Sequence, residues 1–442
     1  MLIGVFAMTP ISTNAFTDED TNGTTGQCIW EYDDSTKTLI ISGSGRTEDN
    51  ELTGLYRPDA PWENVRNLIK NVVVENGVTY IGKNLFCEHN QLINVTLSNS
   101  VTSVGYNAFG KCPLLKTVKL SNSLKTISDS MLWGCNSLTD ITIPESVTTI
   151  KECAFSNCSA LNSIVIPDSV KAIGADAFYN CTSLKSVKLS NNLTKITSST
   201  FSDCSSLESI IIPEKVTEIE DFAFYYCTSL KNATMSDKVK DIGFRTFKGC
   251  KKLSKITLSN TLKSIGDEAF NDCAALKSIT IPRSVTDLAI NVCTFGYYID
   301  SQNYLKKING FTIYGYNNTA AQEYAKWHSF KFVSLDPKKA NTLTVKTAVK
   351  SVKASALKKS KKTVKPLTIS KAKGTVSVVK IKSGTTKSIY KMITVNKKTG
   401  AITFKKGTYK KGTYKVKLKI TAKGNSEYKA KTVSKTVKIK VK

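Results

Sequence analysis

Eight of the chain's twelve cysteines recur at an interval of 23 residues: Cys112, Cys135, Cys158, Cys181, Cys204, Cys227, Cys250 and Cys273. Thiols at regular spacing could form disulfides, ligate a metal or act as nucleophiles. A fixed interval places them in one column about 5 Å apart instead of in facing pairs. Side chains that point the same way fit a disulfide torsion poorly, and zinc needs a tetrahedral cluster. We therefore predict buried free thiols that pack as small apolar groups, with scattered disulfides or a metal site as the alternatives.

Only two histidines could serve as a base, His89 and His328. His89 occupies the cysteine position of the first repeat, 23 residues before Cys112, so a nucleophilic Cys-His pair is one interpretation. The interpretation that we favour is that His89 is a polar residue at the end of the cysteine column. Cys153 and Cys293 lie off the column and are expected to be packing residues. No phosphate-binding glycine loop or metal-ligand motif is present, so we predict no catalytic residue, no cofactor and no metal.

An aromatic or leucine anchor repeats at the same interval and gives the thiols their register: Phe86, Phe109, Leu132, Phe155, Phe178, Phe201, Phe224, Phe247 and Phe270. Nine copies of one unit predict a solenoid, because a single repeat cannot bury its own apolar face. Alternating pairs such as Ile141 and Ile143 predict one short parallel strand per repeat. The proline position after it, as at Pro144, ends the strand. The segment from Ile173 to Phe178 and its equivalents predict one tight helical turn on the convex side.

These repeats resemble the BspA-like, TpLRR-type leucine-rich repeats of bacterial surface and secreted proteins. The resemblance covers about residues 70 to 290 and extends to flanking segments around Trp62 and around Phe311. It implies an α+β leucine-rich-repeat solenoid with parallel strands on a concave face. It also implies attachment to host proteins or to other cells.

The sequence divides into five segments. We predict a truncated signal peptide at 1–15, an N-terminal capping segment at 16–70, nine repeats at 71–290, a closing segment at 291–336 and a lysine-rich domain at 337–442. The first segment holds a short apolar core and small residues before a cleavage position, but it lacks a basic start. No apolar run approaches the roughly 20 residues of a membrane helix, so we expect a secreted or cell-surface protein without a membrane span.

The net positive charge of the chain comes entirely from the last segment. From Lys338 to Lys442 there are 32 lysines, no arginine and one acid, a net charge of +31, whereas the rest of the chain carries −3. Apolar and polar residues alternate there between glycine turns, which predicts a small β-sandwich. The run from Ile393 to Ala422 is similar to immunoglobulin-like modules of secreted Gram-positive proteins. We expect this domain to bind anionic cell-wall polymers or simply to present a solvated surface. Without arginine and with few aromatics, nucleic acid is not the expected partner.

Residues that alternate with the buried strand positions should form the exposed concave face. Its least polar part gives the candidate ligand-binding residues Thr142, Ser163, Val165, Ser186, Lys188, Ser209 and Ile211. A face built from nine strands suits a host extracellular protein or a surface glycan. The aromatics Trp133, Tyr179, Tyr225 and Tyr226 could instead form a sugar-stacking strip, although half-buried packing is the simpler interpretation. We predict a monomeric, non-enzymatic adhesion protein. The alternatives are a structural surface component and a carbohydrate-binding accessory protein.

Overall fold

The computed structural model describes residues 21–50, 60–425 and 427–442, and it divides into two compact units, Met1–Val333 and Ser334–Lys442. Each unit has its own hydrophobic core. The predicted signal segment 1–15 lies outside the described residues. So do the first residues of the N-terminal capping segment and its part from 51 to 59.

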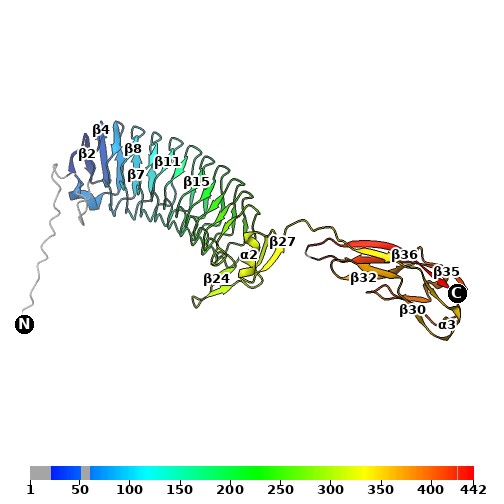
Figure 1. Cartoon of the computed structure of the whole chain (residues 1–442). Helices are drawn as coiled ribbons and strands as arrows, with labels where there is room; N and C mark the ends of the chain where they lie inside the picture. The colour runs from blue at the N-terminus through cyan, green and yellow to red at the C-terminus, as the bar shows by residue number, and fades with distance from the viewer. Residues whose placement is uncertain (1–20, 51–59, 426) are drawn as a thin grey trace, which may run out of the picture. The chain divides into compact units, whose positions relative to one another are not determined.

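Unit 1 is a solenoid of stacked repeats, as predicted (Figure 1). Most repeats contribute a first strand to a row of parallel strands, which we call the first ladder although its pairing is interrupted: β5 (Asn71–Val74), β7 (Asn94–Leu97), β9 (Thr117–Lys119), β12 (Ser163–Val165), β14 (Ser186–Lys188), β16 (Ser209–Ile211), β18 (Asn232–Thr234), β20 (Lys255–Thr257) and β22 (Ser278–Thr280). Paired residues are 23 apart, as in the pairing of Ser163 with Ser186. The strand predicted around Ile141 and Ile143 is wrong: both side chains are buried, but residues 140–143 form no strand.

A second parallel ladder runs beside the first, so the prediction of one strand per repeat is wrong. Its strands are β4 (Gly45–Arg46), β6 (Val78–Ile81), β8 (Ser103–Val104), β10 (Thr126–Ile127), β11 (Thr149–Ile150), β13 (Ala172–Ile173), β15 (Lys195–Ile196), β17 (Glu218–Ile219), β19 (Asp241–Ile242), β21 (Ser264–Ile265) and β23 (Asp287–Leu288). Most are only two residues long. That is too short for the alternation of apolar and polar residues to reveal them in the sequence.

The predicted helical turn does not form a helix, because alternate amides bond to the next repeat and only single bonds run along the chain, such as that from the Tyr179 amide to the Asp176 carbonyl oxygen at 3.0 Å. In the segment 176–180 the end residues Asp176 and Asn180 both have φ of 55°, in the left-handed region that Asp and Asn tolerate best. The amide of Phe178 donates to the carbonyl oxygen of Thr200 at 3.0 Å, and that of Asn180 donates to Ser202 at 2.8 Å. These turns therefore form a third line of hydrogen bonds between repeats.

The anchors form one buried column, in which stacked rings are interrupted once, at Leu132. Phe86 and Phe109 lie 5.2 Å apart between ring centroids with 5° between their planes, and the stack from Phe155 to Phe270 repeats this geometry. The tenth anchor is Phe295, two residues later than the interval predicts. The off-column Cys293 at the expected position is half-buried beside it.

Segments that break the repeat cover both ends of the column. At the N-terminal end β1 (Asn22–Thr25), β2 (Cys28–Asp33) and β3 (Thr38–Gly43) form an antiparallel meander, and a 3₁₀ helix spans Glu63–Leu68. At the other end lie β24 (Tyr297–Ile299), β25 (Leu305–Lys307), β26 (Thr312–Gly315), α2 (Ala320–Trp327) and β27 (Lys331–Ser334). The ring of Trp62 stacks on Phe86 at 5.0 Å, and that of Tyr324 lies 4.4 Å from Phe295. Both caps thus extend the aromatic column.

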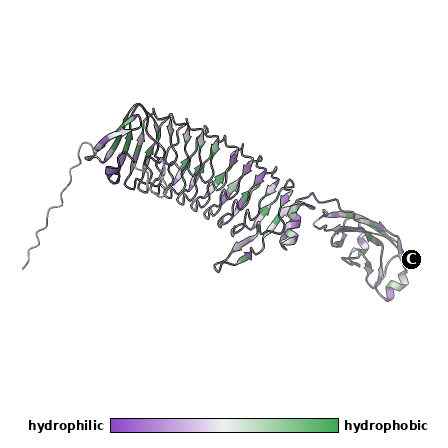
Figure 2. Cartoon of the chain, turned by 60° about the vertical axis from the view of Figure 1, so that its left-hand side comes forward, coloured by the Kyte–Doolittle hydropathy of each residue, from purple (hydrophilic) through white to green (hydrophobic). Residues whose placement is uncertain are grey.

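Unit 2 is a small β unit with two short helices. Its elements are β28 (Thr344–Thr347), β29 (Lys350–Val352), α3 (Ala354–Lys359), β30 (Lys362–Val364), β31 (Leu367–Ser370), β32 (Val376–Ile381), α4 (Lys387–Tyr390), β33 (Ile393–Val395), β34 (Ile402–Phe404), β35 (Gly412–Ala422) and β36 (Lys431–Val441). They form the sheets β29-β36-β35-β32, β30-β34-β33 and β28-β31 around one core. Hydrophilic and hydrophobic residues alternate along the strands (Figure 2). The resemblance to immunoglobulin-like modules stays a prediction.

Candidate binding surface

The predicted binding residues lie on the outer face of the first ladder, and all seven side chains are exposed. Val165 pairs directly with Lys188 across β12 and β14. One repeat further on, Ile211 holds the same position as Lys188. Val165 is 58% exposed and Ile211 is 74% exposed, the highest value among the exposed large hydrophobic residues. Two branched apolar side chains therefore flank one lysine. Because both are exposed, packing in the core does not explain why these positions are apolar.

A shallow hollow lies at this point of the face. The first ladder is not continuous here, because β14 and β16 belong to the separate sheets β12-β14 and β16-β18-β20. Between β14 and β16 is a cavity of about 330 Å³. Four predicted residues line it, Ser186, Lys188, Ser209 and Ile211, together with Asn191 and Pro213 among others. The structure therefore brings these four residues together at a break in the strand pairing.

A second hollow lies at another break in the ladder, between β9 and β12. It measures about 340 Å³ and is lined by Thr142 together with Thr117, Lys119 and Asp140 among others. It coincides with the repeat in which residues 140–143 form no strand. Thr142 is thus separated from the first hollow by β12, which carries Ser163 and Val165. Five of the seven predicted residues therefore line the two hollows, and the other two, Ser163 and Val165, lie on the strand between them.

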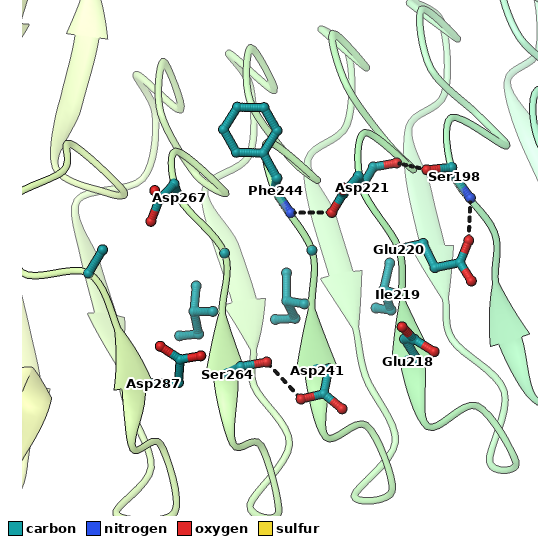
Figure 3. Close-up of a pocket in the computed structure, with 15 residues that line it drawn as sticks. Ser198, Glu218, Ile219, Glu220, Asp221, Asp241, Phe244, Ser264, Asp267 and Asp287 are labelled. Carbon is teal, nitrogen blue, oxygen red and sulfur yellow. Dashed lines mark hydrogen bonds between the residues drawn. The ribbon is translucent and has the colours of Figure 1, made fainter.

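A third hollow was not predicted from the sequence. It lies along the second ladder, measures about 470 Å³, and carries acidic side chains (Figure 3): Glu218, Glu220, Asp221, Asp241, Asp267 and Asp287. Gly243 and Gly266 keep it open, because a Cβ on Gly243 would lie 2.5 Å from the Asp221 carboxylate and one on Gly266 2.5 Å from the Gly243 backbone. The sequence does contain a pattern that indicates this hollow: acidic residues recur at multiples of 23 residues, at Glu218, Asp241 and Asp287.

Three of these six carboxylates bond to other groups of the chain. Asp221 accepts a hydrogen bond from the Phe244 amide at 2.7 Å, and Asp241 accepts one from the Ser264 hydroxyl at 2.7 Å. Glu220 pairs with Lys195 at 2.5 Å. Such contacts stabilise the turns between repeats. Within the described residues, no group of three or more His, Cys, Asp or Glu side chains could hold a metal ion.

The aromatic residues beside the anchor column are mostly packed against neighbours. Tyr225 and Tyr226 form an edge-to-face pair with centroids 4.5 Å apart, and both are half-buried. Lys111 lies over the ring of half-buried Trp133 at 5.2 Å. Only Tyr179 reaches 36% exposure. The packing interpretation of these four residues therefore fits the structure better than a continuous sugar-stacking strip.

The eight column cysteines are buried and stacked in register, as predicted. Sequence reasoning missed what their thiols do. Each Sγ donates a hydrogen bond to the carbonyl oxygen of the anchor in the preceding repeat, at 3.1 to 3.2 Å, as Cys181 does to Phe155. Burial raises the pKa of every one of these thiols above its ordinary value. Since only the thiolate is nucleophilic, the column is chemically inert.

We expect the folded protein to react with a thiol reagent mainly at Cys153 and Cys293, which are half-buried, and at the column only after denaturant is added. Peptide mass spectrometry of alkylated protein measures this. Replacing Cys181 by serine should lower the free energy of unfolding by about 1 to 3 kcal/mol, because a shorter hydroxyl is left buried without an assured partner. Recovery of disulfide-linked Cys158 and Cys181 peptides from the native protein would contradict the prediction that the column thiols are free.

His89 is a structural residue of the N-terminal cap. It is fully buried, and its Nε2 accepts a hydrogen bond from Trp62 Nε1 at 3.0 Å while Nδ1 lies 3.3 Å from the carbonyl oxygen of Cys87. Burial, reinforced by the nearby Arg66 guanidinium, lowers the pKa of His89 to about 3. Because the Cys112 thiol bonds to a backbone carbonyl, the two residues do not form a nucleophile and base pair.

His328 belongs to the closing segment. Its Nδ1 lies 2.7 Å from the hydroxyl of Tyr297, and its ring packs 4.2 Å from the ring of Tyr324. Burial lowers the pKa of His328 as well. Neither histidine makes a direct hydrogen bond to a thiol among the described residues; His328 is linked to Cys293 only through the Tyr297 hydroxyl.

Comparison with known proteins identifies the 23-residue repeats of unit 1 as leucine-rich repeats. Residues 63–185 and 171–298 match the BspA type leucine rich repeat region, in six copies, over more than half of the chain. Similar solved structures include three bacterial leucine-rich-repeat proteins. A leucine-rich repeat protein of Eubacterium ventriosum is 23% identical over 60% of this chain and 92% of its own (TM-score 0.38). A leucine rich cell surface protein of Faecalibacterium prausnitzii is 26% identical over 60% and 84% (TM-score 0.34). The T. pallidum leucine rich repeat protein is 23% identical over 52% and 91% (TM-score 0.35).

No curated protein matches the chain. Among the residues that the structure describes, every helix is too short or too polar to cross a membrane.

Proposed function

Because the chain belongs to the BspA-type leucine-rich-repeat family, we propose that it is a secreted or cell-surface bacterial protein that binds a macromolecular partner through the first ladder. Proteins of this family are typically found at the bacterial cell surface, and leucine-rich repeats are typically non-catalytic scaffolds. The partner class that we propose is a host extracellular protein, with a surface glycan as the alternative.

The observation that carries this proposal is the pair of exposed apolar residues around Lys188. Val165 and Ile211 stay 58% and 74% exposed on a face whose other outward residues are mostly Ser, Thr and Lys. Protein interfaces tend to combine an apolar centre with a polar rim. Nine repeats at about 4.8 Å give a face roughly 40 Å long, which suits a protein or an extended glycan better than a small metabolite.

The hollow between β14 and β16 supports the same centre. It lies directly beside Ile211 and is lined by both apolar and hydroxyl side chains. A partner side chain could enter it while the surrounding strand face makes flat contact. A purely structural surface component would not need this combination of an apolar rim and a recess.

Replacing Val165, Lys188 and Ile211 together by Asp, Glu and Asp in the full chain should abolish capture of a partner. The change puts three negative charges where an apolar contact centre is expected. Capture is measured by pull-down against host matrix proteins and surface glycans.

The matched control replaces Thr234, Lys255 and Thr257 by Asp, Glu and Asp. These residues are exposed on the same ladder, and their replacement changes the net charge equally. The control should keep the partner. If the first variant still captures it, with circular dichroism and melting unchanged, the first ladder is not the binding surface.

We further propose that unit 2 holds the protein to anionic polymers of the cell wall. The charge of +31 over residues 338–442, beside −3 for the rest, supports this role. Because unit 2 has its own core, its charge acts as a separate module. Attraction of this kind is screened over about 8 Å at physiological ionic strength, so it must weaken in salt.

A further inference from the structure

One sheet face of unit 2 collects lysines from its two long strands. β35 and β36 pair antiparallel, so residues opposite one another point to the same side of the sheet. Val416, Leu418, Val437 and Ile439 face the core and are buried. The residues between them face outward. Five of these are lysines, which we call the lysine face: Lys415, Lys417, Lys419, Lys438 and Lys440.

The lysines are neighbours without acidic partners. Lys415 lies directly opposite Lys438, an arrangement in which like charges destabilise a sheet. The only acidic side chain from residue 338 onward is Glu427, which lies between β35 and β36 and outside the strands. The face thus concentrates positive charge that the unit itself does not neutralise. An external anion would remove the repulsion.

The remaining outward residues suit an anionic polymer. Ser434 and Thr436 place hydroxyl groups opposite Lys419 and Lys417, and hydroxyls donate hydrogen bonds to phosphate oxygens. Thr421 and Thr432 lie beyond them, with their hydroxyls 2.9 Å apart. Lysines two residues apart on β35 are about 6.8 Å from one another along the strand. The outward face is therefore a regular array of cations and donors, which matches a chain of regularly repeated anions better than a single ion.

The same face is poorly suited to nucleic acid. Unit 2 from residue 338 contains no arginine. The aromatic residue of these two strands, Tyr414, pairs with the inward-facing Ile439 and so lies on the core side. Binding of single strands relies on aromatic side chains on which bases stack. The lysine face offers charge and hydroxyls but no stacking platform.

We propose that the lysine face binds a linear phosphodiester polymer through its phosphates. This inference deepens the proposed role of unit 2 in holding the chain to wall polymers, and it assigns that role to one sheet face. Binding should be salt-dependent, and each lost phosphate contact should reduce the slope of log affinity against log salt by about 0.7.

The test compares two full-chain variants that each lose three positive charges. The face variant is K415Q/K417Q/K438Q. The control is K358Q/K359Q/K361Q, whose lysines are exposed in and next to α3 and belong to neither of the two strands. Affinity for poly(glycerol phosphate) is measured by titration from 50 to 500 mM salt. We expect the face variant to lose about tenfold or more in affinity and about 2 in slope, and the control to lose much less.

Equal losses in the two variants would overturn the lysine face, while leaving attraction by the unit as a whole. If the full chain binds no better than a chain of residues 1–337, the role of unit 2 in tethering fails too. Polyglutamate that competes as well as the phosphate polymer at equal charge would overturn recognition of phosphate. Tighter binding to a single-stranded DNA oligonucleotide would overturn the choice of polymer class.

Discussion

Replacing Phe201 by alanine is expected to destabilise unit 1 by about 4 kcal/mol, the cost of emptying a fully buried aromatic site. Phe201 is 0% exposed and is stacked on both sides, 5.5 Å from Phe178 and 5.6 Å from Phe224. A cavity here cannot collapse easily, because the backbone on either side is held by hydrogen bonds between repeats. Urea denaturation followed by circular dichroism measures the loss.

The control is Phe201→Leu, since the column already accepts a leucine at Leu132. This variant should cost about 1 to 2 kcal/mol, because most of the volume is retained. Hydrogen exchange should show the weakening in the repeats next to Phe201 first, because each repeat contacts only its neighbours. Equal destabilisation by leucine and alanine would show that ring stacking, rather than filled volume, holds the column.

The N-terminal cap is expected to lose about 2 kcal/mol of stability between pH 6.5 and pH 4.5 through His89 alone. The pKa of His89 is about 3 when folded and 6.5 as a free side chain. The unfolded chain therefore binds more protons than the folded one in this range. The contribution of neutral His89 to stability is fully present above pH 6.5 and declines as the pH falls toward 3. Denaturant midpoints at several pH values measure the decline.

The matched variant is His89→Gln, which keeps a donor and an acceptor near Trp62 and Cys87 but does not titrate. It should be less stable than the wild type at pH 7, and its stability should fall less on acidification. The difference between the two curves isolates His89, because His328, whose pKa is also lowered, is present in both. Parallel curves for the two proteins would show that His89 is not a buried neutral residue in the fold.

The residues of the solenoid core could be predicted from the sequence because each repeat samples the same environment. The interval of 23 residues fixed the aromatic anchors, the thiol column and the alternating strand residues such as Ile164. A wrong assignment of a buried position in one repeat would stand out against the other eight repeats. For the same reason the outward residues around Lys188 could be named, since they alternate with buried ones.

Features that depend on contacts between repeats could not be predicted. The strand missing at residues 140–143 has an apolar pattern like that of its neighbours, and only the pairing of adjacent strands reveals the break. The hollow beside Ile211 arises from a similar interruption. The sequence around Phe178 predicts a helical turn, but the amides of Phe178 and Asn180 donate to the following repeat.

By itself, the sequence determined the period, the residues that fill each buried column and the separation of a neutral solenoid from a basic unit. The tertiary structure decided where the ladders break, that the Cys181 thiol bonds to the Phe155 carbonyl, and that Phe295 rather than Cys293 continues the anchors. It also gathered five lysines on one face of unit 2. The physical reason is that burial follows from each residue's own position in the repeat, whereas hydrogen bonds, hollows and shared faces depend on how separate segments align.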